Sequence, residues 1–151
     1  MLFVPADKPA LAVKAAASGA DALILDLEDA VPEAAKAGAR ATARSVLVEP
    51  RQVPVFVRIN GAQTDHALAD LEAVLGGRPD GILLPKCGGM ADVHAIGWAM
   101  DQLGAAAEIE LMPSIEAASA LEAIPALAAA SPRVRRVGLG LGDLALDLGM
   151  A

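Results

Sequence analysis

Short apolar runs alternate along this chain with longer segments in which apolar residues recur at helical spacing. Short apolar runs bounded by turn residues are typical of buried strands, and the longer amphipathic segments are typical of helices. The pattern predicts strands at 2–6, 22–25, 53–60, 81–86, 108–116 and 136–143. It predicts helices at 7–18, 32–47, 64–75, 91–103, 117–130 (interrupted near Pro125) and 144–148. Asp7 is the expected cap of the first helix, and Thr64 or Asp65 that of the third.

The ends of the apolar runs follow one another at nearly regular intervals. Their spacings are 23, 31, 26, 30 and 27 residues when the ends are taken as Ala6, Asp29, Asn60, Lys86, Glu116 and Asp143. One βα unit has about this length, and six such units without an antiparallel hairpin predict a parallel sheet. No G-x-G-x-x-G motif follows the first run, which disfavours a dinucleotide-binding sheet. We therefore predict an α/β fold of the TIM type, the (β/α)8 barrel.

The length of the chain fits only part of such a barrel. A complete barrel normally needs about 200 residues or more, whereas this chain has 151. We expect residues 1–151 to form a single barrel domain of about six βα units, with C-terminal units seven and eight missing. Such a chain is either a fragment or needs a partner to close its open edge.

Composition excludes several classes of partner. The net charge is −7 and no basic run is present, which argues against nucleic acid and anionic membranes. No apolar run reaches the length of about 18 residues that a membrane span requires, and the start lacks the pattern of a signal peptide. Cys87 is the only cysteine, so no internal disulfide can form. These features favour a reducing compartment, and we expect a cytoplasmic protein.

Acidic residues at two neighbouring strand ends suggest a metal site. Glu116 and Asp143 end the fifth and sixth runs, so their carboxylates are expected to lie a few ångströms apart. At about 4 Å and an effective dielectric constant near 20, two such charges repel by about 4 kcal/mol. They must share a proton, pair with a cation or hold a metal, and an open site of oxygen ligands suits Mg²⁺. The alternative is that each carboxylate caps the helix that follows it.

Basic residues at other strand ends suggest how an anion is held. Arg58 lies in an apolar run, where its charge must pair or point into the barrel mouth, and its planar fork fits a carboxylate. Its other possible role is to pair with Asp26, Glu28 or Asp29, and both roles are compatible. Lys86 is interpreted as a structural partner of the same acids, with a catalytic amine as the alternative. Cys87 has no histidine placed to activate it.

Six segments together resemble the citrate lyase beta-subunit-like family, which includes relatives of malyl-CoA lyase. They are LFVPADKP (2–9), DALILDLEDAV (21–31), VRIN (57–60), LLPK (83–86), SIEAA (114–118) and LGLGDLALDLG (139–149). The resemblance implies a TIM-type barrel that binds Mg²⁺ through Glu116 and Asp143. It implies that Arg58 grips the substrate carboxylate, that Glu116 also lies at the substrate, and that Asp26, Glu28, Asp29 and Lys86 support them.

The same resemblance implies a reaction and an assembly. The family cleaves or forms a carbon–carbon bond between a 2-oxo or 2-hydroxy acid and an acyl thioester, usually of coenzyme A, and its members often form trimers. This sequence departs from the family pattern in lacking an arginine before the first strand and in having Ala117 and Leu139 at two motif positions. The C-terminal segment that supplies an acidic catalytic residue in several relatives is also missing.

Three functional hypotheses follow. The first is a Mg²⁺-dependent carbon–carbon lyase in which the metal stabilises an enolate and Arg58 clamps the acid. The second is a Schiff-base aldolase that uses Lys86. The third is a non-catalytic barrel fragment that binds a partner subunit. The general base, the particular acid and thioester, and the direction of the reaction are left open by the sequence.

Overall fold

The computed structural model describes residues 1–150, and Ala151 lies outside the described residues. Six parallel strands form one sheet in sequential order. They are β1 (Leu2–Pro5), β2 (Leu23–Asp26), β3 (Val55–Arg58), β4 (Gly81–Leu84), β5 (Glu110–Ile115) and β6 (Gly138–Leu139). A helical segment follows each strand, which confirms the α/β fold with six parallel βα units. The sequential order is that of a partial TIM-type barrel and differs from the order of a doubly wound sheet.

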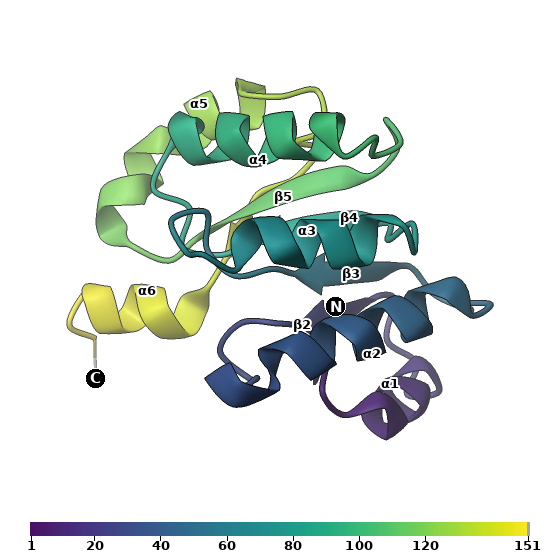
Figure 1. The fold of residues 1–151 in the computed structure, drawn as a ribbon. Coiled ribbons are helices and arrows are strands. Elements are labelled where there is room, and N and C mark those ends of the chain that lie inside the picture. Colours follow the sequence, from purple (N-terminus) through teal and green to yellow (C-terminus); the bar gives the residue numbers. More distant parts are fainter. Residues whose placement is uncertain (151) are drawn as a thin grey trace.

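The helices are short; the first five pack on one side of the sheet, whereas the start of the sixth borders the cavity on the other side. They are α1 (Pro9–Ala16), α2 (Lys36–Val48), α3 (Ala67–Leu75), α4 (Met90–Gln102), α5 (Ile124–Ala129) and α6 (Leu141–Asp147), with 3₁₀ turns at Glu33–Ala35 and Ala118–Ala123. In Figure 1, α2, α3 and α4 lie in front of the sheet and α6 stands apart from them. Within residues 1–150, no helix combines the length and the apolar character needed to cross a membrane.

The two faces of the sheet have different cores. The helix-covered outer face holds a large apolar cluster that includes Leu25, Val57, Ile82 and Leu111. The inner face holds a small cluster formed by Ala22, Ile24, Phe56, Leu83 and Met112. Because successive strand residues point to opposite faces, the polar residues two positions beyond Ile24, Phe56 and Met112 lie on this inner face. The alternation therefore places Asp26, Arg58 and Ser114 at its carboxyl edge.

Several predicted boundaries are wrong in detail. The sixth strand was expected at 136–143, but β6 has two residues and α6 already begins at Leu141. A glycine-rich edge strand that pairs only with β5 has little to hold it extended. Asp143 consequently lies in the first turn of a helix rather than at a strand end.

Other strands are also shorter than predicted, with β3 at Val55–Arg58, β4 at Gly81–Leu84 and β5 at Glu110–Ile115, and several helices begin at other residues. The region 117–130 divides into a 3₁₀ turn and a short helix, with Pro125 in the first turn of α5. Neither α1 nor α3 has a side-chain cap: Asp7 makes none, and the Thr64 hydroxyl instead donates to Gly61 O at 2.8 Å. The helix expected from residue 32 begins with the 3₁₀ turn, and α2 proper starts at Lys36.

Candidate active site

An open cavity of about 780 Å³ lies over the inner face. Its apolar wall includes Ile24, Leu83 and Met112, and its polar rim includes Asp26, Arg58, Ser114, Glu116 and Asp143. These rim residues come from β2, β3, β5, the residue after β5 and α6. The structure therefore gathers at one carboxyl edge residues that are more than one hundred positions apart in sequence.

Asp26 and Arg58 form the most direct charge pair of this edge. They are register partners on the adjacent strands β2 and β3. Arg58 Nε donates to Asp26 Oδ1 at 2.8 Å and its Nη2 donates to Oδ2 at 2.6 Å, so the pair is bidentate. The guanidinium also lies 5.0 Å from the centre of the Phe3 ring. Since Asp26 uses only two of the five guanidinium N–H donors, others stay available for Glu28 and for an anion in the cavity.

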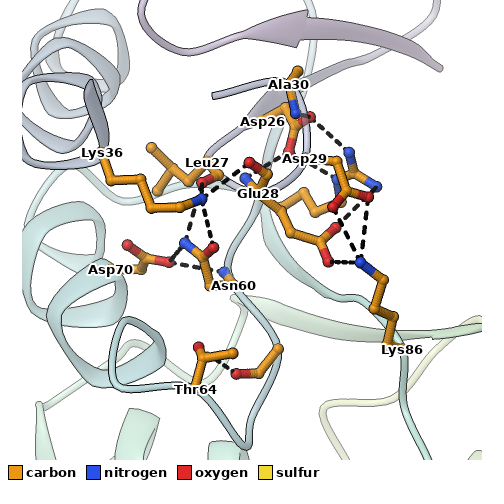
Figure 2. Close-up of polar contacts among 12 residues, drawn as sticks. Asp26, Leu27, Glu28, Asp29, Ala30, Lys36, Asn60, Thr64, Asp70 and Lys86 are labelled. Carbon is orange, nitrogen blue, oxygen red and sulfur yellow. Dashed lines mark hydrogen bonds and ion pairs between the residues drawn. The ribbon is translucent and has the colours of Figure 1, made fainter. Parts of the chain in front are cut away.

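Glu28 links Arg58 to Lys86. Its Oε2 lies 3.1 Å from Arg58 Nη1, and its Oε1 lies 2.7 Å from Lys86 Nζ. Asp29 adds a contact of 3.1 Å to the same ammonium and a longer one of 3.9 Å to Arg58. Figure 2 shows the two acids meeting Lys86 on one side of the turn. Lys86 itself has a φ of 49°, a conformation unusual for a residue other than glycine.

Burial and pairing set the protonation of this group. Burial raises the pKa of Glu28, although Lys86 and Arg58 oppose that effect. The hydrogen bond to Glu28 is the largest cause that raises the pKa of Lys86, so its ammonium is protonated at neutral pH. Burial lowers the pKa of Arg58, but the hydrogen bond and charge of Asp26 outweigh it and raise the pKa overall. The structure thus places Asp26, Glu28, Asp29, Arg58 and Lys86 in one network of paired charges.

Glu116 and Asp143 also lie together, but without such partners. Burial raises the pKa of Glu116, and the neighbouring Asp143 carboxylate raises it further; hydrogen bonds from the Ser114 hydroxyl and the Lys86 backbone act in the opposite direction. Glu116 is 7% exposed, and its buried Oε2 has no hydrogen-bond partner among the described residues. Neither carboxylate forms an ion pair within residues 1–150.

These two carboxylates fit a Mg²⁺ site. Mg²⁺ in proteins is commonly bound by one or two carboxylates, with waters and substrate in the other positions. The unpartnered buried oxygen of Glu116 is the kind of atom that a cation satisfies. Among residues 1–150, no group of three or more His, Cys, Asp or Glu side chains forms a metal site. The donor set therefore suits a hard cation that keeps open positions, and it does not suit a closed structural metal site.

The total charge of the edge supports the same view. Five carboxylates gather there (Asp26, Glu28, Asp29, Glu116 and Asp143), against the two cations Arg58 and Lys86. An excess of three negative charges in a partly buried site opposes the binding of an acidic substrate. A divalent cation would remove most of that excess.

Gly140 is needed because Glu116 approaches its backbone closely. A Cβ atom built on Gly140 would meet Glu116 Cγ, with Cδ at 2.8 Å and Oε1 at 2.9 Å. Its φ of −83° is open to any residue, so the constraint is space and not backbone conformation. Within the G-x-G-x-G segment 138–142, this is the glycine whose missing side chain leaves room for Glu116.

Three buried polar residues beside the site were not recognised as a unit from the sequence. Lys36, Asn60 and Asp70 are all buried, and Lys36 Nζ donates to Asn60 Oδ1 at 2.7 Å while Asn60 Nδ2 donates to Asp70 Oδ2 at 2.7 Å. Of the three, the sequence pattern places only Asn60 at the end of a predicted strand. Their signal was present in α2, where Lys36 falls on the same stripe as the buried residues Ala39, Ala43 and Leu47.

Cys87 has the passive environment that the sequence indicates. Its side chain is buried, and burial raises the pKa of the thiol, which disfavours the reactive thiolate. His66 pairs with Glu33 at 2.8 Å and contacts Arg40, whereas His94 contacts the Ala130 carbonyl. None of these three side chains lines the cavity on the inner face.

Comparison with known proteins identifies the family. The profile described as HpcH/HpaI aldolase/citrate lyase matches residues 1–151. An L-malyl-CoA/beta-methylmalyl-CoA lyase of Cereibacter sphaeroides is 36% identical over 99% of this chain and 50% of that protein. A (3S)-malyl-CoA thioesterase of the same species is 35% identical over the same shares. The chain thus spans about half the length of these curated relatives.

A solved structure gives the same result. CitE of Mycobacterium tuberculosis, in complex with magnesium, acetoacetate and coenzyme A, is 36% identical. It superposes with a TM-score of 0.78 over 99% of this chain and 51% of that one. The citrate lyase beta subunit of the same organism with oxaloacetate and magnesium has a TM-score of 0.77 and 35% identity, over 99% of this chain and 61% of that one. By sequence and by fold, this chain belongs to the HpcH/HpaI aldolase/citrate lyase family.

Proposed function

We propose that this chain carries the metal-binding half of the active site of a Mg²⁺-dependent carbon–carbon lyase. Its substrates would be a 2-oxo or 2-hydroxy acid and an acyl thioester such as acyl-CoA. The observation that carries the proposal is that Glu116 and Asp143 lie next to each other without a cationic partner and line the same cavity as Arg58. Relatives named malyl-CoA lyase and a CitE structure with magnesium, acetoacetate and coenzyme A support this chemistry.

In this proposal Glu116 and Asp143 hold the cation and the other rim residues hold the acid. Mg²⁺ bound there would supply a Lewis acid for a carbonyl or hydroxyl oxygen. Arg58 offers its remaining N–H donors to the substrate carboxylate, because Asp26 fixes its plane through two hydrogen bonds. Glu28 and Asp29 hold Lys86 and help to orient Arg58, and Glu116 borders the position of the substrate.

The geometry disfavours the Schiff-base alternative. An amine must be unprotonated to attack a carbonyl group. The pKa of Lys86 is raised by its hydrogen bond to Glu28, which keeps the ammonium protonated. A second observation supports the same conclusion, because Lys86 Nζ is engaged by both Glu28 and Asp29 at 2.7 and 3.1 Å. We therefore infer that Lys86 supports the site electrostatically.

Three further features complete the proposal. We infer a complete (β/α)8 barrel in the active protein, formed with further βα units or a partner. A homotrimer is implied by the family resemblance, and the exposed apolar residues of β1 and α6, among them Leu2, Phe3, Leu141 and Leu146, offer a surface for further βα units or another subunit to cover. A cytoplasmic location is supported by the single buried cysteine.

The proposal is tested by following the products of malyl-CoA in the presence of Mg²⁺. Carbon–carbon cleavage yields a 2-oxo acid, glyoxylate, and acetyl-CoA, whereas thioester hydrolysis yields malate and a free thiol. We expect glyoxylate, detected as its hydrazone, without a matching rise in free thiol. EDTA and Glu116→Ala should each abolish it, while Glu72→Ala, an exposed change on α3, should not.

The other outcomes separate the alternatives. Free thiol without glyoxylate would replace the lyase by a thioesterase, the activity that one relative is named for. A borohydride-trapped adduct on Lys86 would establish the Schiff-base mechanism. No product of either kind under these conditions, together with retained folding, would favour a non-catalytic fragment.

A further inference from the structure

Lys36 is a buried ammonium group that lies outside the cavity. It is the first residue of α2, it is 8% exposed, and it does not line the cavity on the inner face. Its Nζ donates to Leu27 O at 2.9 Å, to Glu28 O at 3.0 Å and to Asn60 Oδ1 at 2.7 Å. All three donors of the ammonium are therefore used. Two of the three acceptors belong to the backbone between Asp26 and Asp29.

Asn60 holds this ammonium in one place. Its Nδ2 donates to Leu27 O at 3.1 Å and to Asp70 Oδ2 at 2.7 Å, and its backbone N–H donates to the same carboxylate oxygen at 2.8 Å. Because a carboxylate only accepts and an ammonium only donates, this network permits one orientation of the amide. Asp70 is fully buried and is itself fixed by Arg40 Nε at 2.7 Å.

The opposite edge of the same turn is held by Asp26. Its Oδ1 accepts the backbone N–H of Glu28 at 2.9 Å, and its Oδ2 accepts that of Ala30 at 3.2 Å. The carboxylate of Asp26 thus accepts hydrogen bonds from the N–H groups of the turn, and the ammonium of Lys36 donates hydrogen bonds to its carbonyl groups. Figure 2 shows Lys36 and Lys86 approaching the turn from opposite sides, with Glu28 between them.

We propose that Lys36 is a positioning residue for the carboxylate clamp, by which we mean Arg58 together with Glu28 and Lys86. Its ammonium fixes the Leu27–Glu28 backbone and thereby directs the Glu28 side chain toward Arg58 and Lys86. The proposal rests on the proposed function, in which Arg58 binds the acid. Glu28 reaches the two cations at 3.1 and 2.7 Å, distances that a shift of its backbone would change. Lys36 touches neither substrate nor metal in this account.

A merely stabilising role explains the arrangement less well. An apolar side chain of similar length would fill the same space and avoid the burial of a charge. After such a replacement, Leu27 O would keep its bond from Asn60 Nδ2 and Glu28 O would keep its bond from the Val31 N–H. Asn60 Oδ1 alone would lose the partner described here. What the ammonium adds is a link, because it joins the Leu27 and Glu28 carbonyl oxygens to each other and to Asn60 through one atom.

The test compares Lys36→Met with Lys14→Met, the same change at an exposed position on α1. For Lys36→Met we expect KM for the acid-bearing substrate to rise about ten- to a hundredfold, because the clamp is misplaced. The Kd for Mg²⁺ should stay within about twofold of the wild type, since Glu116 and Asp143 lie on other elements. Lys36→Arg keeps the charge but presents its donors in one plane, so it should restore part of the KM. An unchanged KM in a folded Lys36→Met protein would overturn the proposal, as would equal losses of acid and Mg²⁺ binding.

A second readout needs no turnover. The Arg58 Nη1 protons, which face Glu28 Oε2 at 3.1 Å, should exchange with water at least about tenfold faster in Lys36→Met than in Lys14→Met when followed by NMR. Should the wild type lack activity, the proposed function fails, and this exchange rate still decides the positioning role. If Lys36→Met does not fold, the same two measurements on Lys36→Gln, which also removes the charge, decide it: wild-type KM and exchange in that variant would contradict the role.

Discussion

The two halves of the carboxyl edge treat their charges in opposite ways. Around β2, β3 and β4, Arg58 and Lys86 pair with Asp26, Glu28 and Asp29 at 2.6–3.9 Å. Around β5 and α6, Glu116 and Asp143 face each other, and neither has an ion-pair partner in the described part of the chain. Paired charges hold one another in place, whereas the buried Glu116 and the exposed Asp143 have no cation beside them, which leaves an interaction for a ligand. The comparison thus separates the half whose charges are already paired from the half that we propose to bind the cation.

The largest effect is expected from breaking the paired half. Arg58→Met would leave Asp26, which is 1% exposed, without its cation. Removing one partner of a buried pair costs about 3–5 kcal/mol of unfolding free energy. Urea unfolding should show this loss, and Arg58→Lys should lose less because it keeps the charge. A loss below about 1 kcal/mol for Arg58→Met would mean that the Asp26–Arg58 pair contributes no more to stability than a solvent-exposed ion pair.

A smaller effect is expected from crowding Glu116 in the other half of the edge, which we call the open half because its carboxylates lack cationic partners. In Gly140→Ala the new methyl group would collide with the Glu116 side chain. A mutation beside a metal ligand that shifts the ligand lowers metal affinity about ten- to a hundredfold. Calorimetric titration with Mg²⁺ measures it, with Gly142→Ala as the matched control because nothing lies within 4 Å of a Cβ there. Equal affinities for the two variants would show that Glu116 does not need its present position.

Ionisation of Glu116 in the open half should also lower the stability of the folded protein. The folded-state pKa of Glu116 is raised above its usual value, by burial first and by Asp143 next. The folded protein therefore holds this proton more tightly, and stability falls as pH rises from the usual glutamate pKa through the raised one. We expect metal-free Glu116→Gln to melt at a higher temperature than the wild type at pH 7. The difference should vanish at pH 3 and below, where both side chains are neutral.

Glu28 also has a raised pKa, but it does not confuse this comparison. It is present in both proteins and cancels in the comparison of wild type with Glu116→Gln. A difference in melting temperature that stays constant from pH 3 to pH 7 would point to altered packing instead of the titration of Glu116.

The smallest effect is expected at the outer end of the paired half. Asp29 is about half exposed and contacts Lys86 at 3.1 Å. Exposed ion pairs contribute about 0–1 kcal/mol, so Asp29→Asn should lower kcat/KM less than about tenfold and barely change the melting temperature. A loss comparable to that of an Arg58 variant would move Asp29 from a supporting to a direct role.

Much of the fold follows from local patterns, because a buried strand followed by an amphipathic helix is encoded within about 30 residues. The period of two along β2 and β3 also places Asp26 and Arg58 on one face. Asp143 was expected at a strand end, but it lies in a helix, since two residues of pairing to β5 are too few to extend a glycine-rich segment. Its nearness to Glu116 arises from the loop and not from the strand.

The contacts of Lys36 could not be predicted in the same way. Its partners Leu27, Glu28 and Asn60 lie 8 to 24 residues away, and a lysine at a helix start ordinarily faces solvent. Only the shared stripe with Ala39 and Ala43 distinguishes it from the other lysines. Long-range satisfaction of buried polar groups is a property of the assembled fold, and no local pattern encodes it.

The central claim is that Glu116 and Asp143 together hold one divalent cation. The most direct test is a titration of the purified protein with Mg²⁺, followed by calorimetry, beside Glu116→Gln and Asp143→Asn. We predict one site in the wild type and a loss of at least about a hundredfold in affinity for each single variant. Wild-type affinity in either single variant, or a second site that stays intact when the other acid is replaced, would contradict the shared site.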